Sequence, residues 1–223
     1  MHQQISKKIL IYLFIFLFLG TFNNRDFLIL NFPKIKNFEI NGLNDFESKK
    51  IHKDLFEIKS QNLFFLQKDE IIEKINSHKI IEKFYIFKNY PSNLYIKIEK
   101  TNFVAITKKN NLNFYIGSNG NLIEAKNKSF DIPFVFGNVD IEEFLKLKKI
   151  IDESDLDYKD IKNFYYFNSS RWDIETKNEL LIKFPKNKLK KSFDILSKIY
   201  EKNEFKNLKL IDLRQDRQVI VNG

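Results

Sequence analysis

Cysteine is missing from this sequence altogether, and glycine, proline, methionine and tryptophan are scarce. The absence of cysteine excludes thiol catalysis, thiolate metal sites and disulfide bonds, although it leaves the compartment open, because exported proteins need not use disulfides. Glycine-rich phosphate-binding loops are also missing, as are the Gly-x-Ser-x-Gly and His-Glu-x-x-His motifs of common hydrolases. We therefore expect no catalytic residues, no cofactor and no metal site.

Acidic residues are outnumbered, because 38 Lys and Arg against 29 Asp and Glu give a net charge of +9. Such an excess can indicate a nucleic acid or an anionic membrane as partner. The lysines are spread along the whole chain, however, and no basic cluster is interleaved with stacking aromatic residues. We therefore expect no nucleic-acid partner. The composition is otherwise that of a folded protein, with 43% hydrophobic residues including 24 Phe.

Few side chains in the sequence are candidate metal ligands. His52 and His78 lie in predicted helices beside lysines, and we expect both to be solvated. The acidic run from Asp152 to Asp160 lacks the glycine and the distal glutamate of a calcium loop, so it predicts a helix end followed by a polar loop. Arg171 and Trp172 could stack on a sugar or a peptide, but packing beside a sheet is the favoured interpretation.

One apolar run stands out near the N-terminus. Lys7 and Lys8 precede 14 uncharged residues that end at Phe22, fewer than the roughly 20 that span a bilayer core. A cleavable signal peptide would require small residues at the end of the run, and these are missing. We favour an uncleaved anchor whose lysines reach the headgroups and keep the N-terminus cytoplasmic. The predicted anchor residues include Ile9, Leu13, Phe16 and Leu19.

The anchor hypothesis divides the chain into segments. Residues 1–8 would be a cytoplasmic tail, residues 9–30 a transmembrane anchor with its exit, and residues 31–37 a linker. Residues 38–102 predict an α+β domain, because strand and helix patterns alternate there in the order β-α-α-β-β. Residues 62–66 are expected to break the first helix and to pack inward. A three-stranded sheet covered on one face by two helices would leave a strand edge for another chain.

The second half, residues 103–223, predicts a mixed, mainly antiparallel β-sheet domain with at least two helices. Its strand pattern starts directly after the first domain without a flexible linker, so we expect the two domains to abut. Ser118-Asn119-Gly120-Asn121 predicts a hairpin turn, because Asn-Gly readily supplies positive φ angles. Amphipathic spacing predicts one helix around Phe144 and another around Phe193. The chain closes with two further strand patterns, at residues 208–214 and 218–221.

Several motifs in this order resemble a known family. Residues 38–43, the Asn-Leu-Phe-x-Leu of residues 62–66, and the Tyr90-Pro91 turn with its following strand are similar to a POTRA domain. Behind one N-terminal anchor, this domain resembles the bacterial FtsQ/DivIB cell-division family. The second half adds three matches: a hairpin at residues 116–120, in which Gly117 replaces the usual acid, a segment at residues 133–137, and the closing residues 211–214.

The resemblance implies a non-enzymatic scaffold of the divisome, held in the inner membrane by a single pass and concentrated at the septum. The bulk of the chain would lie in the periplasm, link early and late division proteins, and bind FtsB and FtsL, with its last strand pairing by strand addition. By position, Arg214 would form the partner's salt bridge, or else only cap a closed sheet. The partner-binding residues implied in this way are Asp212, Arg214, Gln215, Arg217, Val219 and Ile220.

Gln215 stands where the family often carries an aromatic anchor, so we expect Val219 or Ile220 to compensate. The second helix and last strand of the POTRA domain supply a further hypothetical docking surface. Its residues are Asp69, Glu70, Glu73, Tyr95 and Lys97. Two alternatives remain open from the sequence, namely a POTRA-type export chaperone that binds extended peptides and a periplasmic cell-wall hydrolase with two unmarked carboxylates.

Overall fold

The computed structural model describes residues 7–21, 33–125, 130–201, 208–215 and 218–223. The first element is α1 (Lys7–Thr21), a helix of 15 residues. Its apolar side chains between Ile9 and Leu19 are exposed on every face. In the part of the chain that is described, no helix has both the length and the apolar character that crossing a membrane requires. The expected transmembrane helix is therefore not confirmed.

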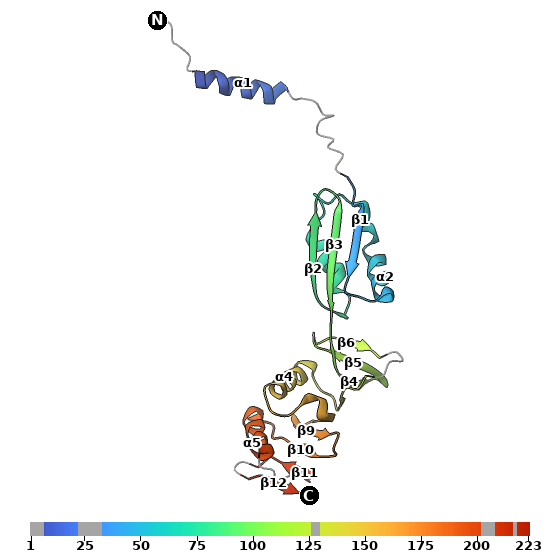
Figure 1. Ribbon diagram of the computed structural model, residues 1–223, viewed down its shortest axis with the longest axis vertical. Helices are drawn as coiled ribbons and strands as arrows, with labels where there is room; N and C mark the ends of the chain where they lie inside the picture. The colour runs from blue at the N-terminus through green and yellow to red at the C-terminus, as the bar shows by residue number, and fades with distance from the viewer. Residues whose placement is uncertain (1–6, 22–32, 126–129, 202–207, 216–217) are drawn as a thin grey trace.

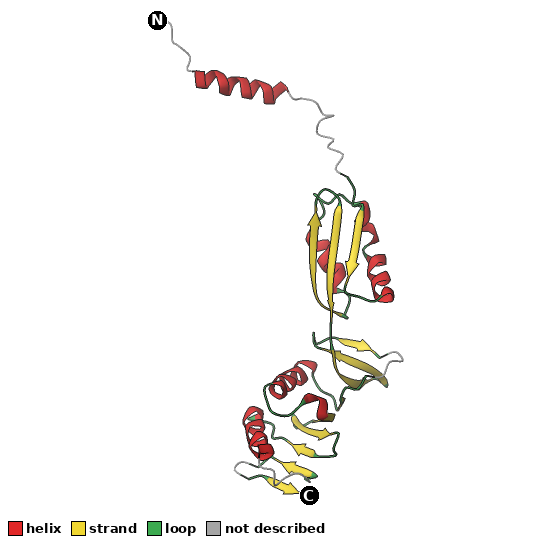
Figure 2. Cartoon of the chain, viewed as in Figure 1, coloured by secondary structure: helices red, strands yellow, loops and turns green. Residues whose placement is uncertain are grey.

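Residues 37–100 form an α+β domain, in which helices cover one face of a three-stranded sheet (Figures 1 and 2). Its elements are β1 (Asn37–Asn41), α2 (Asp45–Asp54), η1 (Phe56–Ser60), α3 (Lys68–Asn76), β2 (Ile81–Asn89) and β3 (Asn93–Lys100). The predicted β-α-α-β-β order is confirmed. The strand order is β1-β3-β2, with β3 parallel to β1 and antiparallel to β2. The last strand is thus the central one, and β1 and β2 form the edges.

Local sequence explains how these elements begin and end. The Asn44 side chain caps α2 by accepting a hydrogen bond from the backbone N–H of Glu47 at 2.9 Å. After β1 the chain turns at Gly42, whose φ is +101°, and a Cβ there would lie 1.8 Å from the carbonyl oxygen of Ile98. Only glycine fits this position, because both the positive φ and the close backbone contact exclude a side chain.

The second domain is built on a nine-stranded sheet with the order β12-β11-β10-β9-β8-β7-β4-β5-β6. Five of its neighbouring strand pairs are antiparallel and three are parallel, which confirms the predicted mixed, mainly antiparallel sheet. The elements are β4 (Phe103–Lys109), β5 (Leu112–Gly117), β6 (Leu122–Glu124), β7 (Phe134–Phe136), α4 (Ile141–Asp152), η2 (Tyr158–Asp160), β8 (Ile161–Phe167), β9 (Arg171–Thr176), β10 (Leu181–Lys183), α5 (Leu189–Glu201), β11 (Leu210–Asp212) and β12 (Ile220–Asn222).

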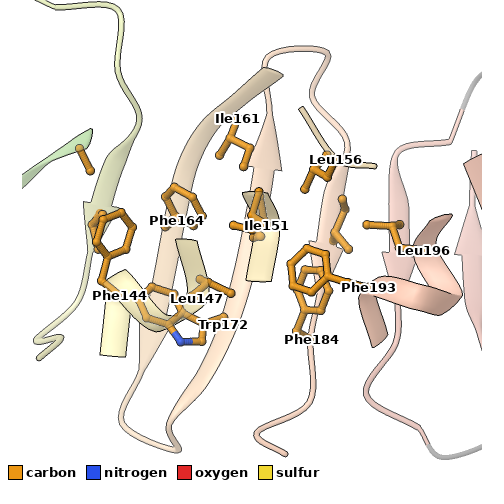
Figure 3. Packing of buried hydrophobic residues seen from close by; sticks show 14 of the residues in the cluster. Phe144, Leu147, Ile151, Leu156, Ile161, Phe164, Trp172, Phe184, Phe193 and Leu196 are labelled. Carbon is orange, nitrogen blue, oxygen red and sulfur yellow. The ribbon is translucent and has the colours of Figure 1, made fainter. Parts of the chain in front are cut away.

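The core of this domain lies between the sheet and helices α4 and α5 (Figure 3). The rings of Phe144 on α4 and Phe164 on β8 meet edge to face at 5.3 Å, and those of Phe184 and Phe193 stack at 4.5 Å. Trp172 is buried in the same cluster, which confirms packing beside the sheet as its role. Burying such aromatic side chains contributes about 2 to 3 kcal/mol each to folding. The predicted helix end at Asp152, followed by a polar loop, is also confirmed.

The two domains abut, as expected, because β3 and β4 are joined by only Thr101 and Asn102. The Asn119 side chain in the β5–β6 hairpin donates hydrogen bonds to the backbone carbonyls of Lys79 and Ile81, at 3.0 and 2.9 Å. The neighbouring Ser118 hydroxyl donates to a carboxylate oxygen of Glu82 at 2.9 Å. The hairpin turn therefore also ties the second domain to the first.

Two expectations for the first domain are wrong. The His78 side chain is only 8% exposed, and its Nε2 lies 2.9 Å from the Asp54 carboxylate, so it is not a solvated residue. Residues 62–66 do not pack inward as a whole. Leu63 and Leu66 are buried, whereas Phe64 and Phe65 point outward and are exposed.

Candidate partner-binding site

Among the residues that the structure describes, the nine-stranded sheet ends at β12, which pairs with β11 on one side and with no strand on the other. In this register, Asp212 lies opposite Ile220, and Ile211 lies opposite Val221. All three residues of β12 are exposed, as is Val219 before it. A strand at the end of a sheet presents backbone N–H and C=O groups along its outer side, which another extended chain can pair with. The C-terminal edge therefore has the geometry for strand addition.

Charged residues form a row across the three strands next to this edge. The register places Lys183 on β10 beside Asp173 on β9 and also beside Asp212 on β11. Each follows or precedes a core residue, so the alternation of a strand points all three away from α4 and α5. We call Asp173, Lys183 and Asp212 the charge row. Alternating signs across neighbouring strands favour this arrangement, because opposite charges that face each other stabilise a sheet.

Two arginines form ion pairs with the aspartates at the two ends of the charge row. The Arg214 guanidinium donates hydrogen bonds to both carboxylate oxygens of Asp212, its Nε lying 2.8 and 2.9 Å from Oδ1 and Oδ2. Arg171 Nε lies 3.3 Å from Asp173 Oδ1. Both carboxylates are nearly buried, whereas the Arg214 side chain remains 37% exposed. Arg214 thus neutralises Asp212 and still faces solvent beside β12.

The two buried carboxyls differ in their acidity. Hydrogen bonds from Arg214 lower the pKa of Asp212 below its ordinary value, although burial acts in the opposite direction. Burial raises the pKa of Asp173, and the charges of Arg171, Lys183 and Arg214 offset only part of this effect. Asp212 is therefore a firmly ionised partner for Arg214. Asp173 is the member of the charge row whose ionised form is disfavoured by burial.

The predicted partner-binding residues are only partly brought together. Asp212 and Arg214 form an ion pair, and Ile220 lies beside Asp212 on the next strand. Gln215 is exposed just after Arg214, and Val219 is exposed just before β12. Arg217 lies outside the described residues. Arg214 contacts Asp212, and among the described residues no strand lies on the outer side of β12, so the partner-binding and capping roles of Arg214 both stay predictions.

Sequence reasoning did not assign three residues to this site, namely Arg171, Asp173 and Lys183. A signal for them existed, because Arg171-x-Asp173 and Asp212-x-Arg214 are both arginine–aspartate pairs two residues apart. Residues i and i+2 of a strand share one face, so each pair can close on itself. What the sequence did not reveal is that β9 and β11 flank the same strand.

The docking surface predicted on the POTRA-like domain is divided between two faces. Tyr95 and Lys97 lie on the central strand β3 and alternate with Leu94, Ile96 and Ile98, which are buried against the helices. They therefore point to the helix-free face. Asp69, Glu70 and Glu73 belong to α3 on the opposite face, where Glu70 accepts hydrogen bonds from Gln61 at 3.1 Å. The five residues do not form one surface.

The described residues contain no group of three or more His, Asp and Glu side chains that could hold a metal ion. The charge row offers no free base either, because Asp212 is neutralised by Arg214, and Asp173 has Arg171 and Lys183 beside it. Buried ion pairs of this kind hold a local geometry and present charge, and they can specify a partner's register. Recognition of an extended chain is the chemistry that suits this edge best.

The sequence comparisons agree with this architecture. Residues 105–214 match the family described as "Cell division protein FtsQ/DivIB, C-terminal", and residues 34–100 match "POTRA domain, FtsQ-type". The Cell division protein FtsQ of Rickettsia bellii (strain RML369-C) is 23% identical over 198 residues, which is 84% of this chain and 72% of that protein. That of Rickettsia typhi (strain ATCC VR-144 / Wilmington) is 26% identical over 188 residues, covering 81% and 69%.

A solved structure is also similar to part of the chain. The major extracytoplasmic domain of the cell division protein DivIB from Geobacillus stearothermophilus is 15% identical, with a TM-score of 0.34, over 44% of this chain and 87% of that one. The two family matches lie in the order POTRA domain then C-terminal domain, and between them they take in most of both folded domains, although β12 lies beyond residue 214, where the second match ends. On these matches and the curated relatives, the chain belongs to the FtsQ/DivIB family of cell division proteins.

Proposed function

We propose that this protein is a non-enzymatic, single-pass scaffold of the bacterial divisome. Residues 9–30 would anchor it in the inner membrane, and the domains at residues 38–102 and 103–223 would lie in the periplasm at the septum. By family resemblance, its partners are FtsB and FtsL, and it links early with late division proteins. The family matches support a role in cell division, and the exposed apolar helix α1 supports a membrane location.

One observation carries the proposal of partner binding. β12 is the last strand of its sheet, and its neighbour β11 ends in the Asp212–Arg214 ion pair beside Ile220. A segment of FtsB that adds to β12 would gain backbone hydrogen bonds along the strand and apolar contacts with Val219 and Ile220. The exposed part of the Arg214 guanidinium would then fix the register, by pairing with an acidic side chain of the partner.

Strand addition predicts a local change in hydrogen exchange. We expect the backbone amides of residues 219–222 to exchange more slowly in the complex with the FtsB and FtsL of the same bacterium, because the partner strand would protect them. β6 (Leu122–Glu124) is the other edge of the same sheet and serves as the internal control. Equal protection at both edges, or protection at neither, counts against docking on β12.

The role of Arg214 needs a paired design, because Arg214→Gln alone would leave the buried Asp212 carboxylate without its cation. Such a loss destabilises a protein by about 3 kcal/mol or more, whatever the partner does. The double variant Asp212→Asn/Arg214→Gln removes both charges, and thermal unfolding should show that its stability is closer to that of the unmodified chain. Lys186→Gln, an exposed substitution on the same domain, is the matched control.

Recovery of FtsB in a pull-down then separates two roles of Arg214. If Arg214 contacts the partner, both the single and the double variants should lose binding by about tenfold or more, as for a charged interface anchor. If Arg214 acts only through Asp212, the double variant should recover both stability and binding. That second result would remove Arg214 from the proposed interface while leaving β12 as the docking strand.

A further inference from the structure

The end of the POTRA domain that lies farthest from the second domain is formed by three loops (Figure 1). The chain arrives here at residues 33–37, returns at residues 59–70 between η1 and α3, and turns again at residues 88–93 between β2 and β3. Backbone hydrogen bonds join the loops, from Ile35 N–H to the Gln61 carbonyl at 3.1 Å and from Lys36 N–H to the Ser92 carbonyl at 2.9 Å. These three segments therefore form one surface.

The middle loop displays two phenylalanines. Leu63 and Leu66 are buried and anchor it to the core, whereas Phe64 is 46% exposed and Phe65 is 73% exposed. The Asn62 side chain accepts a hydrogen bond from the Phe64 N–H at 2.8 Å. The backbone carbonyl of Asn62 accepts hydrogen bonds from the N–H groups of Phe65 and Leu66, at 3.2 and 2.9 Å. This capped turn fixes the backbone, so that the two aromatic side chains between the leucines project outward.

A lysine from the neighbouring strand holds this loop in place. The ammonium group of Lys88 donates hydrogen bonds to the backbone carbonyls of Leu63 and Leu66, at both ends of the Phe64–Phe65 pair. Burial and the nearby charge of Lys68 lower the pKa of Lys88. Two carbonyls that share one cation cannot move independently, so the loop is rigid where it carries its exposed apolar side chains.

Tyr90 in the third loop adds to this apolar surface. Its ring lies 4.6 Å from the ring of Phe64, and its side chain is 55% exposed. We call Phe64, Phe65 and Tyr90 the aromatic tip. Exposed aromatic clusters on a rigid loop are unfavourable in water and mark a surface that is covered in use.

The charges around the aromatic tip are mainly positive. Residues 33–37, 59–70 and 88–93 contain five lysines and two acidic residues. One of these acids, Glu70, already accepts hydrogen bonds from Gln61. Lys34, Lys36 and Lys68 are all exposed. A rigid aromatic centre with lysines around it matches the interface of an anionic bilayer, where aromatic rings lie at the headgroup level and lysines pair with phosphates.

We propose that the aromatic tip docks on the anionic phospholipid surface in which α1 is held, so that the POTRA domain stands on the membrane instead of hanging from a free linker. The position of this surface rests on the proposed membrane location of α1. Pro33, the first residue of the domain that is described, follows the last residue of α1, Thr21, by 12 positions. Such a segment reaches about 40 Å at most, so the tip cannot be far from the surface.

The absence of cysteine makes a direct test simple, because one introduced cysteine gives one labelled site. The full chain is placed in vesicles of equal parts phosphatidylcholine and phosphatidylglycerol, with brominated acyl chains as the quencher. A fluorophore replaces Phe65, and in separate samples it replaces Leu13 of α1 or Lys146 of α4. We expect quenching of the label at Phe65 in these vesicles, weaker quenching in pure phosphatidylcholine, and none at Lys146.

A charge-reversed variant tests the lysines separately. In Lys34→Glu/Lys36→Glu/Lys68→Glu the docked fraction should fall by about tenfold or more, since each lysine beside an anionic surface contributes roughly fivefold. The matched variant Lys53→Glu/Lys83→Glu/Lys109→Glu changes three exposed lysines away from the tip and should behave like the parent chain. All six positions are exposed, so folding should be retained, as circular dichroism can verify.

The outcomes distinguish this inference from the proposed anchor. Quenching at Leu13 without quenching at Phe65 overturns the docked tip and leaves the anchor standing. Quenching at neither site overturns both proposals. If the label at Phe65 is quenched equally in neutral vesicles and in the charge-reversed variant, recognition of an anionic surface is wrong. If it is shielded from an aqueous quencher but not reached by the lipid one, the tip is covered by protein, and the inference fails.

Discussion

The two carboxylates of β9, Glu175 and Asp173, have pKa values that shift in opposite directions. Glu175 on β9 accepts hydrogen bonds from the Tyr165 hydroxyl at 2.6 Å and from the Asn163 side chain at 2.9 Å, and it pairs with Lys162 at 3.1 Å. These donors lower its pKa to about 2. Asp173 on the same strand lacks such donors, and burial raises its pKa instead. Hydrogen-bond donors therefore dominate the acidity of Glu175, whereas burial dominates that of Asp173.

Glu175 therefore gives a pH-dependent contribution to stability. Its folded pKa of about 2 lies below the unfolded value, so the contribution is fully present above about pH 4.5 and is lost as the pH falls towards 2. We expect Glu175→Gln to lower the free energy of unfolding by about 1 to 2 kcal/mol at pH 7, with the difference from the parent chain shrinking through this window. Urea unfolding across pH 2 to 7 measures it.

The control for this prediction is Glu179→Gln, because Glu179 lies on the turn that follows β9 and is exposed. Its substitution should leave both the stability and its pH dependence unchanged within about 0.5 kcal/mol, as for ordinary surface positions. A constant difference between Glu175→Gln and the parent chain, unchanged down to pH 2, would show that the lost contact is not with the ionised carboxylate.

Single-residue roles were the least predictable from the sequence. His78 was predicted to lie in a helix, but α3 ends at Asn76 and His78 follows it. Nothing in the sequence shows that α2 brings Asp54 within 2.9 Å of its ring. Likewise, the apolar run at residues 62–66 predicts burial, whereas the turn capped by Asn62 and the hydrogen bonds from Lys88 hold the loop with Phe64 and Phe65 facing outward. The contacts of His78 with Asp54 and of Lys88 with the loop join residues that are distant in the sequence.

At the scale of elements, periodicity predicted nearly all of the helices and strands, because each has an alternating or helical apolar pattern and a turn signal at its end. The residues predicted to form the two amphipathic helices are those of α4 and α5. The order of the strands within each sheet could not be predicted from this periodicity. The central position of β3 follows from its parallel pairing with β1, which requires contacts between residues 37–41 and residues 93–97.

The joint between the two domains depends on the β5–β6 hairpin, and this gives a prediction about domain motion. Asn119→Ala removes the donors to the Lys79 and Ile81 carbonyls, while Ser118 and Thr101 keep their own contact at 3.1 Å. We expect a loss of stability of about 1 to 2 kcal/mol and a wider range of interdomain distances. Pulsed electron resonance between spin labels at Lys83 and Lys146 measures the distances.

Asn113→Ala is the matched control, since Asn113 is exposed on β5 of the same hairpin. It should leave both the unfolding transition and the distance distribution as they are in the parent chain. A distance distribution that stays narrow in Asn119→Ala would mean that the short link at Thr101 and Asn102 holds the joint without the side-chain hydrogen bonds.

At the scale of the whole molecule, the proposed contacts lie at opposite ends of the folded chain. The aromatic tip belongs to the far end of the POTRA domain, and β12 lies at the far end of the nine-stranded sheet (Figure 1). A scaffold with one end on the membrane and the other on a partner would fix the height of that partner above the bilayer. The motifs that revealed the family come from both domains, but they did not reveal this separation, because it depends on how the sheets are joined.

The membrane anchor is the proposal on which this arrangement depends, and α1 supplies its test. Leu13 and Phe16 lie in the middle of an apolar helix, and both are exposed. A lysine at the centre of a membrane helix is unfavourable by about 3 kcal/mol, so Leu13→Lys/Phe16→Lys should move most of the protein from the membrane fraction to the alkaline carbonate extract. Leu112→Lys/Phe136→Lys, which changes two exposed apolar residues of the second domain, should remain with the membrane. If both double variants and the parent chain are extracted alike, α1 is not an anchor, and the protein must reach the division site by its partners alone.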